Sequence, residues 1–134
     1  MQISREITDA TESLFRGKNF AFVASLMGDG SPQITPVWID YDGTLLLVNT
    51  AEGRTKQRNL ARDPRVAVSI IDSENPYNTV SVQGTVVEQT AEGADDHIDK
   101  LAKKYLGVDK YPFRNPAEKR IILKIRPEKV YHMR

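Results

Sequence analysis

The sequence predicts a mainly β, α+β fold in which about six short antiparallel strands form a small barrel. Two observations support this class. Short alternating or apolar segments are separated by tight turns, such as those at 28–31 and 42–43, a spacing typical of β-hairpins. The most amphipathic helical segment comes late in the chain, after most of the strands, which does not fit the strand–helix alternation of a parallel sheet.

A short helix is expected near the N-terminus, over residues 5–16. Ala10, Leu14 and Phe15 recur at helical spacing, and Gly17 follows as a residue type that commonly ends helices. This helix would bury one small apolar stripe.

Strand-forming segments follow, and the last two of them are expected to close the sheet. They cover residues 20–27, 33–41, 44–49, 66–71, 79–88, 120–126 and 129–132. Segments 44–49 and 66–71 are apolar at successive positions, which is typical of strands covered on both faces. Because this exceeds what a small barrel needs for its own interior, we expect a second copy of the chain to cover one outer face, forming a homodimer. Gly84, within an alternating segment, predicts a bulge.

The late helix is expected between Thr90, as its N-cap, and Gly107. Acids precede lysines along it, in the order that the helix dipole favours. Its apolar positions recur at helical spacing and are Ala94, Ile98, Leu101, Ala102 and Tyr105. This apolar face is expected to pack on the sheet, and residues 108–118, which contain two prolines, are expected to form a loop.

Composition excludes several classes of protein. A length of 134 residues suits a single domain, 1–134, and the absence of cysteine excludes disulfides and thiolate chemistry. Two distant histidines do not make a metal site. No apolar run approaches the roughly 18 residues of a membrane span, and a net charge of +1 argues against a general nucleic-acid binder. We therefore expect a cytoplasmic protein that engages neither membrane nor nucleic acid.

The most informative segment covers residues 48–65, where an apolar run ends and a short helix with a cationic first turn begins. Backbone N–H groups at a helix start have no intrahelical partner and lie at the positive end of the helix dipole, so an anion binds there readily. The side-chain donors would be Thr50, Arg54, Thr55 and Lys56. On the residues alone, a solvated helix face is the favoured interpretation of these cations, since Arg54, Arg58 and Arg62 are spaced i, i+4, i+8.

Four motifs occur in order along the chain. They are Asn49-Thr50-x4-Thr55-Lys56, Asn59-Leu60-x-Arg62-Asp63-Pro64-Arg65-Val66, Asn75-Pro76-Tyr77 and Val80-x-Val82-x-Gly84-x-Val86, with a closing run from Arg120 to Val130. This order resembles the pyridoxamine 5'-phosphate oxidase-like split β-barrel superfamily. Within it, the chain is most similar to the flavin/deazaflavin oxidoreductases that use coenzyme F420. The resemblance covers about 20–132 and implies a dimeric, six-stranded antiparallel split β-barrel with short helices.

The resemblance also implies a cofactor site at the dimer interface. A flavin-like ring would lie against the strand 35–38, with residues 48–50 beside the ring and its ribityl chain and the terminal phosphate on residues 54–56. Arg58, with Lys18, would meet the oligoglutamate tail of F420, and Tyr77 would reach in from the partner subunit. The cofactor-binding set is Thr35, Pro36, Val37, Trp38, Val48, Asn49, Thr50, Arg54, Thr55, Lys56, Arg58, Asn59 and Tyr77. Trp38 could equally be a core residue, and His97 and His132 have no assigned role.

The function that follows is hydride transfer between F420 and a small unsaturated or quinone-like substrate. No catalytic side chain is expected, because the cofactor carries the reaction and the protein supplies binding and orientation. FMN is the alternative cofactor, since it too carries a phosphate on a ribityl chain. The chain ends before the segment with which pyridoxamine 5'-phosphate oxidase helps hold its substrate, so vitamin B6 oxidation is not expected. A related FMN oxidoreductase and a non-catalytic flavin- or haem-binding carrier stay open as alternatives. A binder of single-stranded nucleic acid would need aromatic residues in a basic groove, and is disfavoured.

Overall fold

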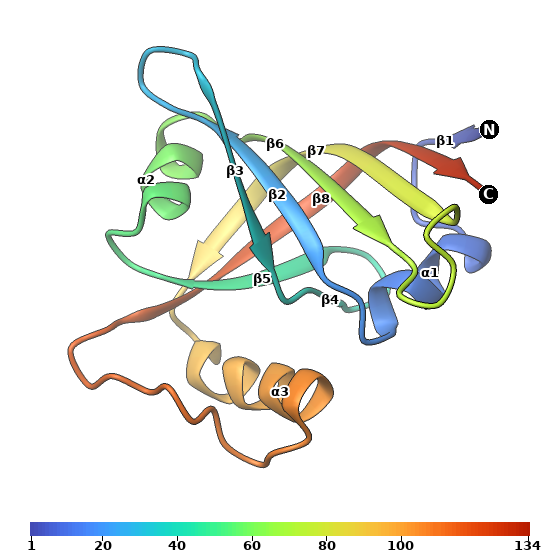
Figure 1. The fold of residues 1–134 in the computed structure, drawn as a ribbon. Helices are drawn as coiled ribbons and strands as arrows, with labels where there is room; N and C mark the ends of the chain where they lie inside the picture. The colour runs from blue at the N-terminus through green and yellow to red at the C-terminus, as the bar shows by residue number, and fades with distance from the viewer.

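The computed structural model describes residues 1–134 and contains one eight-stranded antiparallel sheet with three helices (Figure 1). The strand order is β3-β2-β6-β7-β8-β5-β4, and β1 pairs with β8 outside this path. The elements are β1 (Gln2–Ser4), α1 (Asp9–Arg16), β2 (Ala21–Leu26), β3 (Pro32–Val37), β4 (Asp40–Tyr41), β5 (Leu46–Ala51), α2 (Thr55–Arg62), β6 (Arg65–Ile71), β7 (Thr79–Thr90), α3 (Ala94–Leu106) and β8 (Arg120–Met133). The predicted mainly β, antiparallel class is confirmed.

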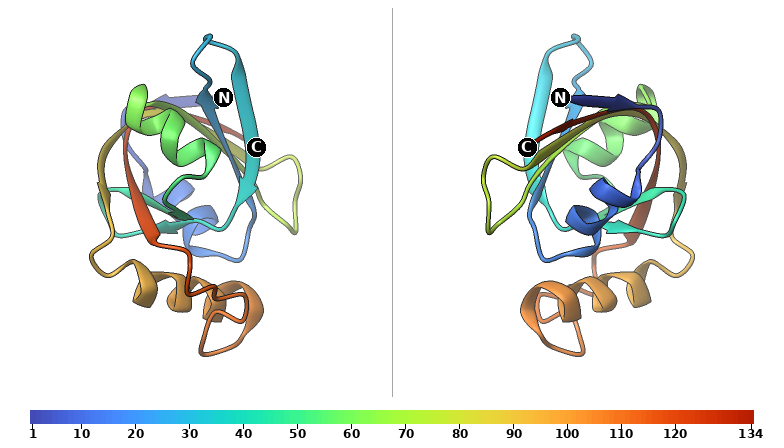
Figure 2. Two further views of the ribbon diagram at one scale, coloured as in Figure 1. Left: turned by 90° about the vertical axis from the view of Figure 1, so that its left-hand side faces the viewer. Right: turned by 90° about the vertical axis from the view of Figure 1, so that its right-hand side faces the viewer.

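The sheet curls into a half-barrel, and its end strands β3 and β4 do not pair with each other (Figure 2). The prediction of six strands was wrong by two short ones, β1 and β4. The predicted strand 33–41 is interrupted because Trp38 and Ile39 leave the ladder between β3 and β4. The two predicted closing strands are instead one continuous strand, β8, whose end pairs with β1 and brings the termini together (Figure 1).

The helices begin later than the sequence predicted. The N-terminal helix starts at Asp9, because the amide of Thr8 donates to Thr11 Oγ1 (2.9 Å) and so caps the helix there. The late helix starts after Gly93, not after Thr90, because β7 continues through Thr90 and Gly93 then turns the chain at φ 73°. No helix of the structure is long and apolar enough to cross a membrane.

The core fills the concave side of the sheet with inward-facing aliphatic side chains such as Leu46, Val68 and Leu123. Within the single chain, buried and half-buried positions alternate along β6, and Ile71 at its end is 40% exposed, so coverage of the second face of segment 66–71 by another copy of the chain stays a prediction. One face of β6 therefore carries the core contacts, as in an ordinary half-buried strand.

The bulge predicted at Gly84 is confirmed. The β7–β8 register shifts between Gln83 and Gly84, and a Cβ at Gly84 would collide with the carbonyl oxygen of Arg126. Only glycine allows the two backbones to approach this closely.

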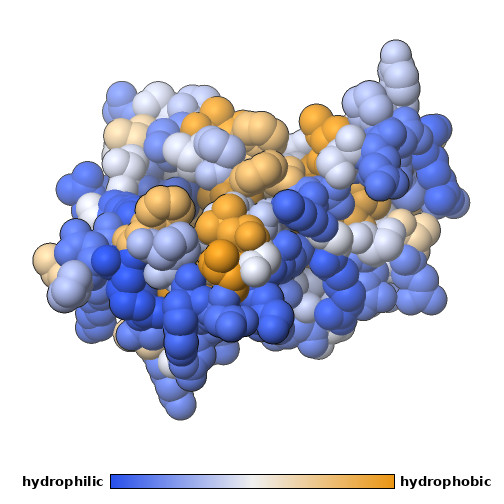
Figure 3. Space-filling view, turned by 60° about the horizontal axis from the view of Figure 1, so that its bottom comes forward, coloured by the Kyte–Doolittle hydropathy of each residue, from blue (hydrophilic) through white to orange (hydrophobic).

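Helix α3 lies outside the half-barrel, with the loop of residues 107–119 folded along it (Figure 2). Ile98, Leu101 and Tyr105 form a second, small apolar cluster, against which Trp38 and Tyr111 pack. The face that carries α3 is largely hydrophilic, with apolar side chains gathered near its middle (Figure 3). This arrangement leaves a hollow between α3, its loop and the sheet.

Candidate functional site

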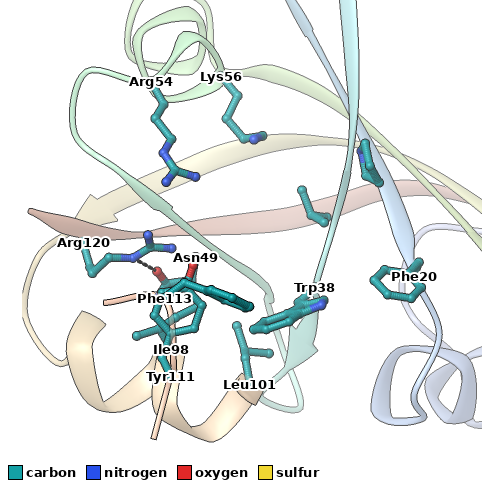
Figure 4. Close-up of a pocket in the computed structure, with 12 residues that line it drawn as sticks. Phe20, Trp38, Asn49, Arg54, Lys56, Ile98, Leu101, Tyr111, Phe113 and Arg120 are labelled. Carbon is teal, nitrogen blue, oxygen red and sulfur yellow. Dashed lines mark hydrogen bonds between the residues drawn. The ribbon is translucent and has the colours of Figure 1, made fainter. Parts of the chain in front are cut away.

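A pocket of about 280 Å³ lies where the end of β3, the paired strands β5 and β8, the start of α2, and α3 with its loop meet (Figure 4). Its lining residues are Phe20, Pro36, Val37, Trp38, Asn49, Arg54, Lys56, Ile98, Leu101, Tyr111, Phe113 and Arg120. They come from segments far apart in the sequence, so the pocket exists only in the folded chain.

One end of the pocket is cationic. Arg54 and Lys56 point into it from the start of α2, and Arg120 enters from the first residue of β8 (Figure 4). Both arginines contact one carboxylate, since Arg54 Nη2 lies 2.7 Å from Glu118 Oε1 and Arg120 Nη1 lies 3.0 Å from Glu118 Oε2. The hydrogen bond from Arg54, reinforced by Arg120, lowers the pKa of Glu118. One negative charge therefore faces three positive ones.

Lys56 completes this cluster without a carboxylate partner. Its pKa is lowered, first because the side chain is partly buried and then because Arg54 and Arg120 repel its charge. A partly buried ammonium group that neighbouring cations repel is stabilised when an anion binds beside it. The electrostatics of this end therefore favour a ligand with a negative charge.

The local chain path explains why these cations converge. β5 ends at Ala51, Gly53 turns the chain at φ 88°, and its amide donates to Gln57 Oε1 (2.8 Å). Arg54 is then the N-cap of α2, whose first turn contains no acid. The first-turn amides of α2 lack intrahelical partners and add to the positive potential there.

The opposite end of the pocket is aromatic. The Trp38 ring stacks on Tyr105 with 5.3 Å between centroids and 5° between planes, and Tyr111 meets Trp38 edge-on at 6.0 Å. Tyr111 in turn contacts Phe113, which is 67% exposed at the rim. Figure 4 shows Trp38 and Phe20 on the side of the pocket away from Arg54 and Arg120. A planar apolar group fits this end.

Asn49 lies beside the cationic end of the pocket. Strand β5 pairs with β8 so that Asn49 lies opposite Ile122 and Ala51 opposite Arg120, which makes Asn49 and Arg120 diagonal neighbours on the outer face. Asn49 Oδ1 accepts a hydrogen bond from Arg120 Nε (2.9 Å; Figure 4). The Arg120 guanidinium also lies 5.4 Å from the centroid of the Tyr111 ring, so Tyr111, which meets Trp38 on its other side, lies between the cationic and the aromatic end.

The structure brings about half of the predicted cofactor residues together. Those that line the pocket are Pro36, Val37, Trp38, Asn49, Arg54 and Lys56. Pro36 lies on the edge strand β3, as expected of a residue without an N–H. Trp38 is both a lining residue and a packing partner of the cluster around Tyr105.

The other predicted residues lie outside the lining. Val48 is fully buried in the core, and the hydroxyls of Thr35 and Thr50 are buried without a hydrogen-bond partner. Thr55 opens α2, and Arg58 is exposed one turn further along.

Asn59, also in α2, is buried and donates to Ser25 Oγ (3.1 Å), so it ties the helix to β2. Tyr77 is 83% exposed in the β6–β7 connection. Lys18 is exposed between α1 and β2 and does not line the pocket.

Six lining residues carried no site prediction from the sequence, and five of them belong to α3, its loop or the start of β8. They are Phe20, Ile98, Leu101, Tyr111, Phe113 and Arg120. Arg120 is 71 residues from Asn49, and only the pairing of β5 with β8 reveals that the two are neighbours. A polar residue opening an apolar strand was the one local signal available for Arg120.

The family model described as pyridoxamine 5'-phosphate oxidase matches residues 7–134 of this chain. The chain therefore belongs to the pyridoxamine 5'-phosphate oxidase-like split β-barrel family, whose members bind flavins or F420. Among solved structures it is similar to an F420 reductase, with 31% identity over 90% of this chain and 94% of that one and a TM-score of 0.79.

Two more distant structures share the fold. HupZ from group A Streptococcus is 22% identical over 94% of this chain and 93% of its own, with a TM-score of 0.68. A protein from Lactobacillus delbrueckii described as a putative pyridoxamine 5'-phosphate oxidase is 21% identical over 98% and 99%, also with a TM-score of 0.68. At these identities the likeness concerns architecture alone.

Proposed function

We propose that this protein is an oxidoreductase that transfers a hydride between coenzyme F420 and a small unsaturated or quinone-like organic substrate. One observation carries the proposal: a single pocket has three converging cations at one end and stacked aromatic rings at the other. A cofactor with a planar ring system and a phosphate on a flexible chain matches both ends. The similarity to an F420 reductase supports the same choice.

The chain's own residues would bind the cofactor and orient its ring. Arg54, Lys56 and Arg120 would bind the phosphate, and the partnerless, charge-repelled amine of Lys56 fits such a group. Trp38 and Tyr111 would position the ring and exclude water from one side of it. The cofactor, when bound, supplies the hydride chemistry, so orientation in a dry pocket is the contribution required of the protein.

FMN is the alternative cofactor, since it would use the same cations. The oligoglutamate tail, which F420 carries and FMN lacks, distinguishes the two cofactors. Arg58 follows Arg54 by one helical turn on α2 and is exposed, so it would meet a tail that extends beyond the phosphate. Arg58→Ala is expected to weaken F420 binding while leaving FMN binding unchanged, and titration of both cofactors into both proteins measures this.

The binding experiment tests the site. Replacing Arg54 and Lys56 by Ala is expected to abolish binding of F420 and FMN, measured by calorimetry, while circular dichroism stays that of the wild type. Replacing Arg126 and Lys129 by Ala removes the same two positive charges from exposed positions on β8 away from the pocket and serves as the matched control. Near-normal affinity in the double variant would locate the phosphate elsewhere and refute the proposal.

Turnover separates an enzyme from a carrier. Reduced F420 or FMN is mixed with the protein and a panel of quinones and activated alkenes, and oxidation of the cofactor is followed by absorbance. Acceptor-dependent oxidation above the protein-free rate supports the oxidoreductase. Tight binding without oxidation by any acceptor favours the alternative of a non-catalytic flavin carrier.

We further propose that the protein acts as a homodimer with the pocket at the interface and Tyr77 contributed by the partner subunit. Ile34 is 64% exposed, and its neighbours across the outer faces of β2 and β3 include Phe22 and Pro36, which together form an apolar surface beside the pocket. Ile34→Glu is expected to give a monomer by sedimentation and to lower cofactor affinity. A monomeric wild-type protein with full affinity would refute the interface.

A further inference from the structure

A series of buried polar side chains runs from β4, through α3 and β5, to the cationic end of the pocket. His97 Nε2 lies 3.3 Å from Asp40 Oδ2, His97 Nδ1 lies 3.2 Å from Asn49 Nδ2, and Asn49 Oδ1 accepts from Arg120 Nε at 2.9 Å. Asp40, His97 and Arg120 are each 7–8% exposed. We propose that His97, oriented by Asp40, is a positioning residue that acts through Asn49 to fix the guanidinium of Arg120. The inference rests on the proposed function, because it assigns Arg120 to anion binding.

Hydrogen-bond chemistry determines the direction of each step. A guanidinium only donates, so the atom of Asn49 facing Arg120 Nε is the amide oxygen. The amide nitrogen of Asn49 then faces the carbonyl oxygen of Ala94 (2.9 Å) and Nδ1 of His97. Since Asn49 Nδ2 donates, Nδ1 of His97 must carry a lone pair, and the ring proton resides on Nε2, towards Asp40.

The surroundings of Asp40 favour this tautomer. Burial raises the pKa of Asp40, but the interaction with His97, the hydrogen bond from the Tyr41 amide (2.8 Å) and the nearby Lys100 outweigh it and keep the pKa well below its usual value. Asp40 is therefore a carboxylate, and its negative charge 3.3 Å from Nε2 favours the Nε2–H form of His97, although the two atoms are not aligned as a hydrogen bond.

This series leaves Asn49 with little capacity for a ligand. Both amide protons have acceptors in the protein, and the oxygen already accepts from Arg120. His97 itself does not line the pocket, so its influence on a ligand passes through Asn49. Fixing Arg120 before binding reduces the side-chain entropy that a ligand contact would otherwise cost.

Two substitutions of His97 separate the two ring nitrogens. His97→Asn places an oxygen where Nδ1 stands and keeps the acceptor for Asn49, whereas His97→Gln places an amide nitrogen near the Nε2 position and keeps only the donor to Asp40. We expect His97→Asn to bind FMN, F420 and inorganic phosphate within about threefold of wild type. We expect His97→Gln to bind them about tenfold more weakly, the equivalent of one hydrogen bond.

Nitrogen-15 NMR gives a readout that does not depend on a ligand. In the wild type, Nδ1 of His97 is expected to be unprotonated and Nε2 protonated, and the Arg120 Nε–H signal to be sharp and slow to exchange. The Arg120 signal should persist in His97→Asn and broaden in His97→Gln. A wild-type protein with the proton on Nδ1, equal losses in both variants, or no loss in either would overturn the inference.

Failure of the proposed function would look different. If the wild type binds neither cofactor nor phosphate, Arg120 is no anion ligand, yet the NMR signals still report whether His97 fixes its guanidinium. If the wild type binds and both His97 variants match it with an unchanged Arg120 signal, the positioning role alone is refuted.

Discussion

Replacing Glu118 by Gln is expected to tighten binding of a phosphate-bearing cofactor. Glu118 lies within hydrogen-bonding distance of both Arg54 and Arg120, the two guanidinium groups assigned to the phosphate. A phosphate on those groups therefore competes with the Glu118 carboxylate for the same N–H donors and is repelled by its charge. The glutamine side chain keeps the size and one acceptor but removes the repulsion.

The size of the effect follows from distance and exposure. Two like charges about 4 Å apart repel by ~1 kcal/mol in water and ~4 kcal/mol near a protein surface. The Glu118 side chain is 26% exposed, so solvent screening favours the lower part of this range. The variant also loses ion pairs that help to order the arginines, which at an exposed site contribute ~0.2–1 kcal/mol. The net gain is about 1 kcal/mol, equivalent to about fivefold tighter binding.

Isothermal titration of FMN and F420 into both proteins at low ionic strength measures this difference, which added salt should reduce. Glu128→Gln is the matched control, because it removes the same charge from β8 beside Arg126 and away from the pocket. Unchanged or weaker binding in Glu118→Gln would show that Glu118 organises the two arginines for the ligand and does not compete with it.

Three further predictions concern the pocket and the sheet. The lowered pKa of Lys56 means that its charge is lost at a lower pH than that of an ordinary lysine, so phosphate affinity should begin to fall at an alkaline pH below the range in which an ordinary lysine loses its proton; Lys56→Met should remove this part of the pH profile in alkaline titrations. Trp38 is the only tryptophan, so its fluorescence should be quenched when FMN or F420 binds; saturation without quenching would exclude the aromatic end as the ring site. Gly84→Ala should lower the free energy of unfolding by about 2 kcal/mol or more through its clash with the Arg126 carbonyl, whereas Gly28→Ala, which meets only ordinary contacts, should change the melting temperature little.

Features that depend on nearby residues were predictable from the sequence. The bulge at Gly84, the apolar face of α3 and its end at Gly107 all follow from local spacing and residue type. The same is true of Arg54 and Lys56, because a cationic helix start is visible within a few residues. Where local signals compete, the ends of predicted elements differ from those in the structure. Thr90 is of a residue type suited to an N-cap, but it pairs with Ile122 in the β7–β8 ladder and so belongs to the strand.

Features that depend on strand pairing were not predictable. Arg120 faces the pocket because of its register against β5, and His97 gains partners from β4 and β5 that its own helix does not indicate. The N-terminal strand Gln2–Ser4 is too short to show a pattern and forms because β8 offers it an edge. These contacts join residues that are far apart in the sequence, so the helical or strand periodicity of a local segment does not reveal them.

The alignment of Ala51 with Arg120 has a consequence for how this chain tolerates changes in length. Neighbouring positions on a strand face opposite sides, so adding or deleting one residue between Arg120 and Ile125 would turn the guanidinium from the ligand towards the hydrophobic interior. The preceding loop imposes no such alternation. Relatives that have gained or lost residues should therefore carry those changes in the loop before Arg120, because a change of length there does not alter which side of the sheet Arg120 faces.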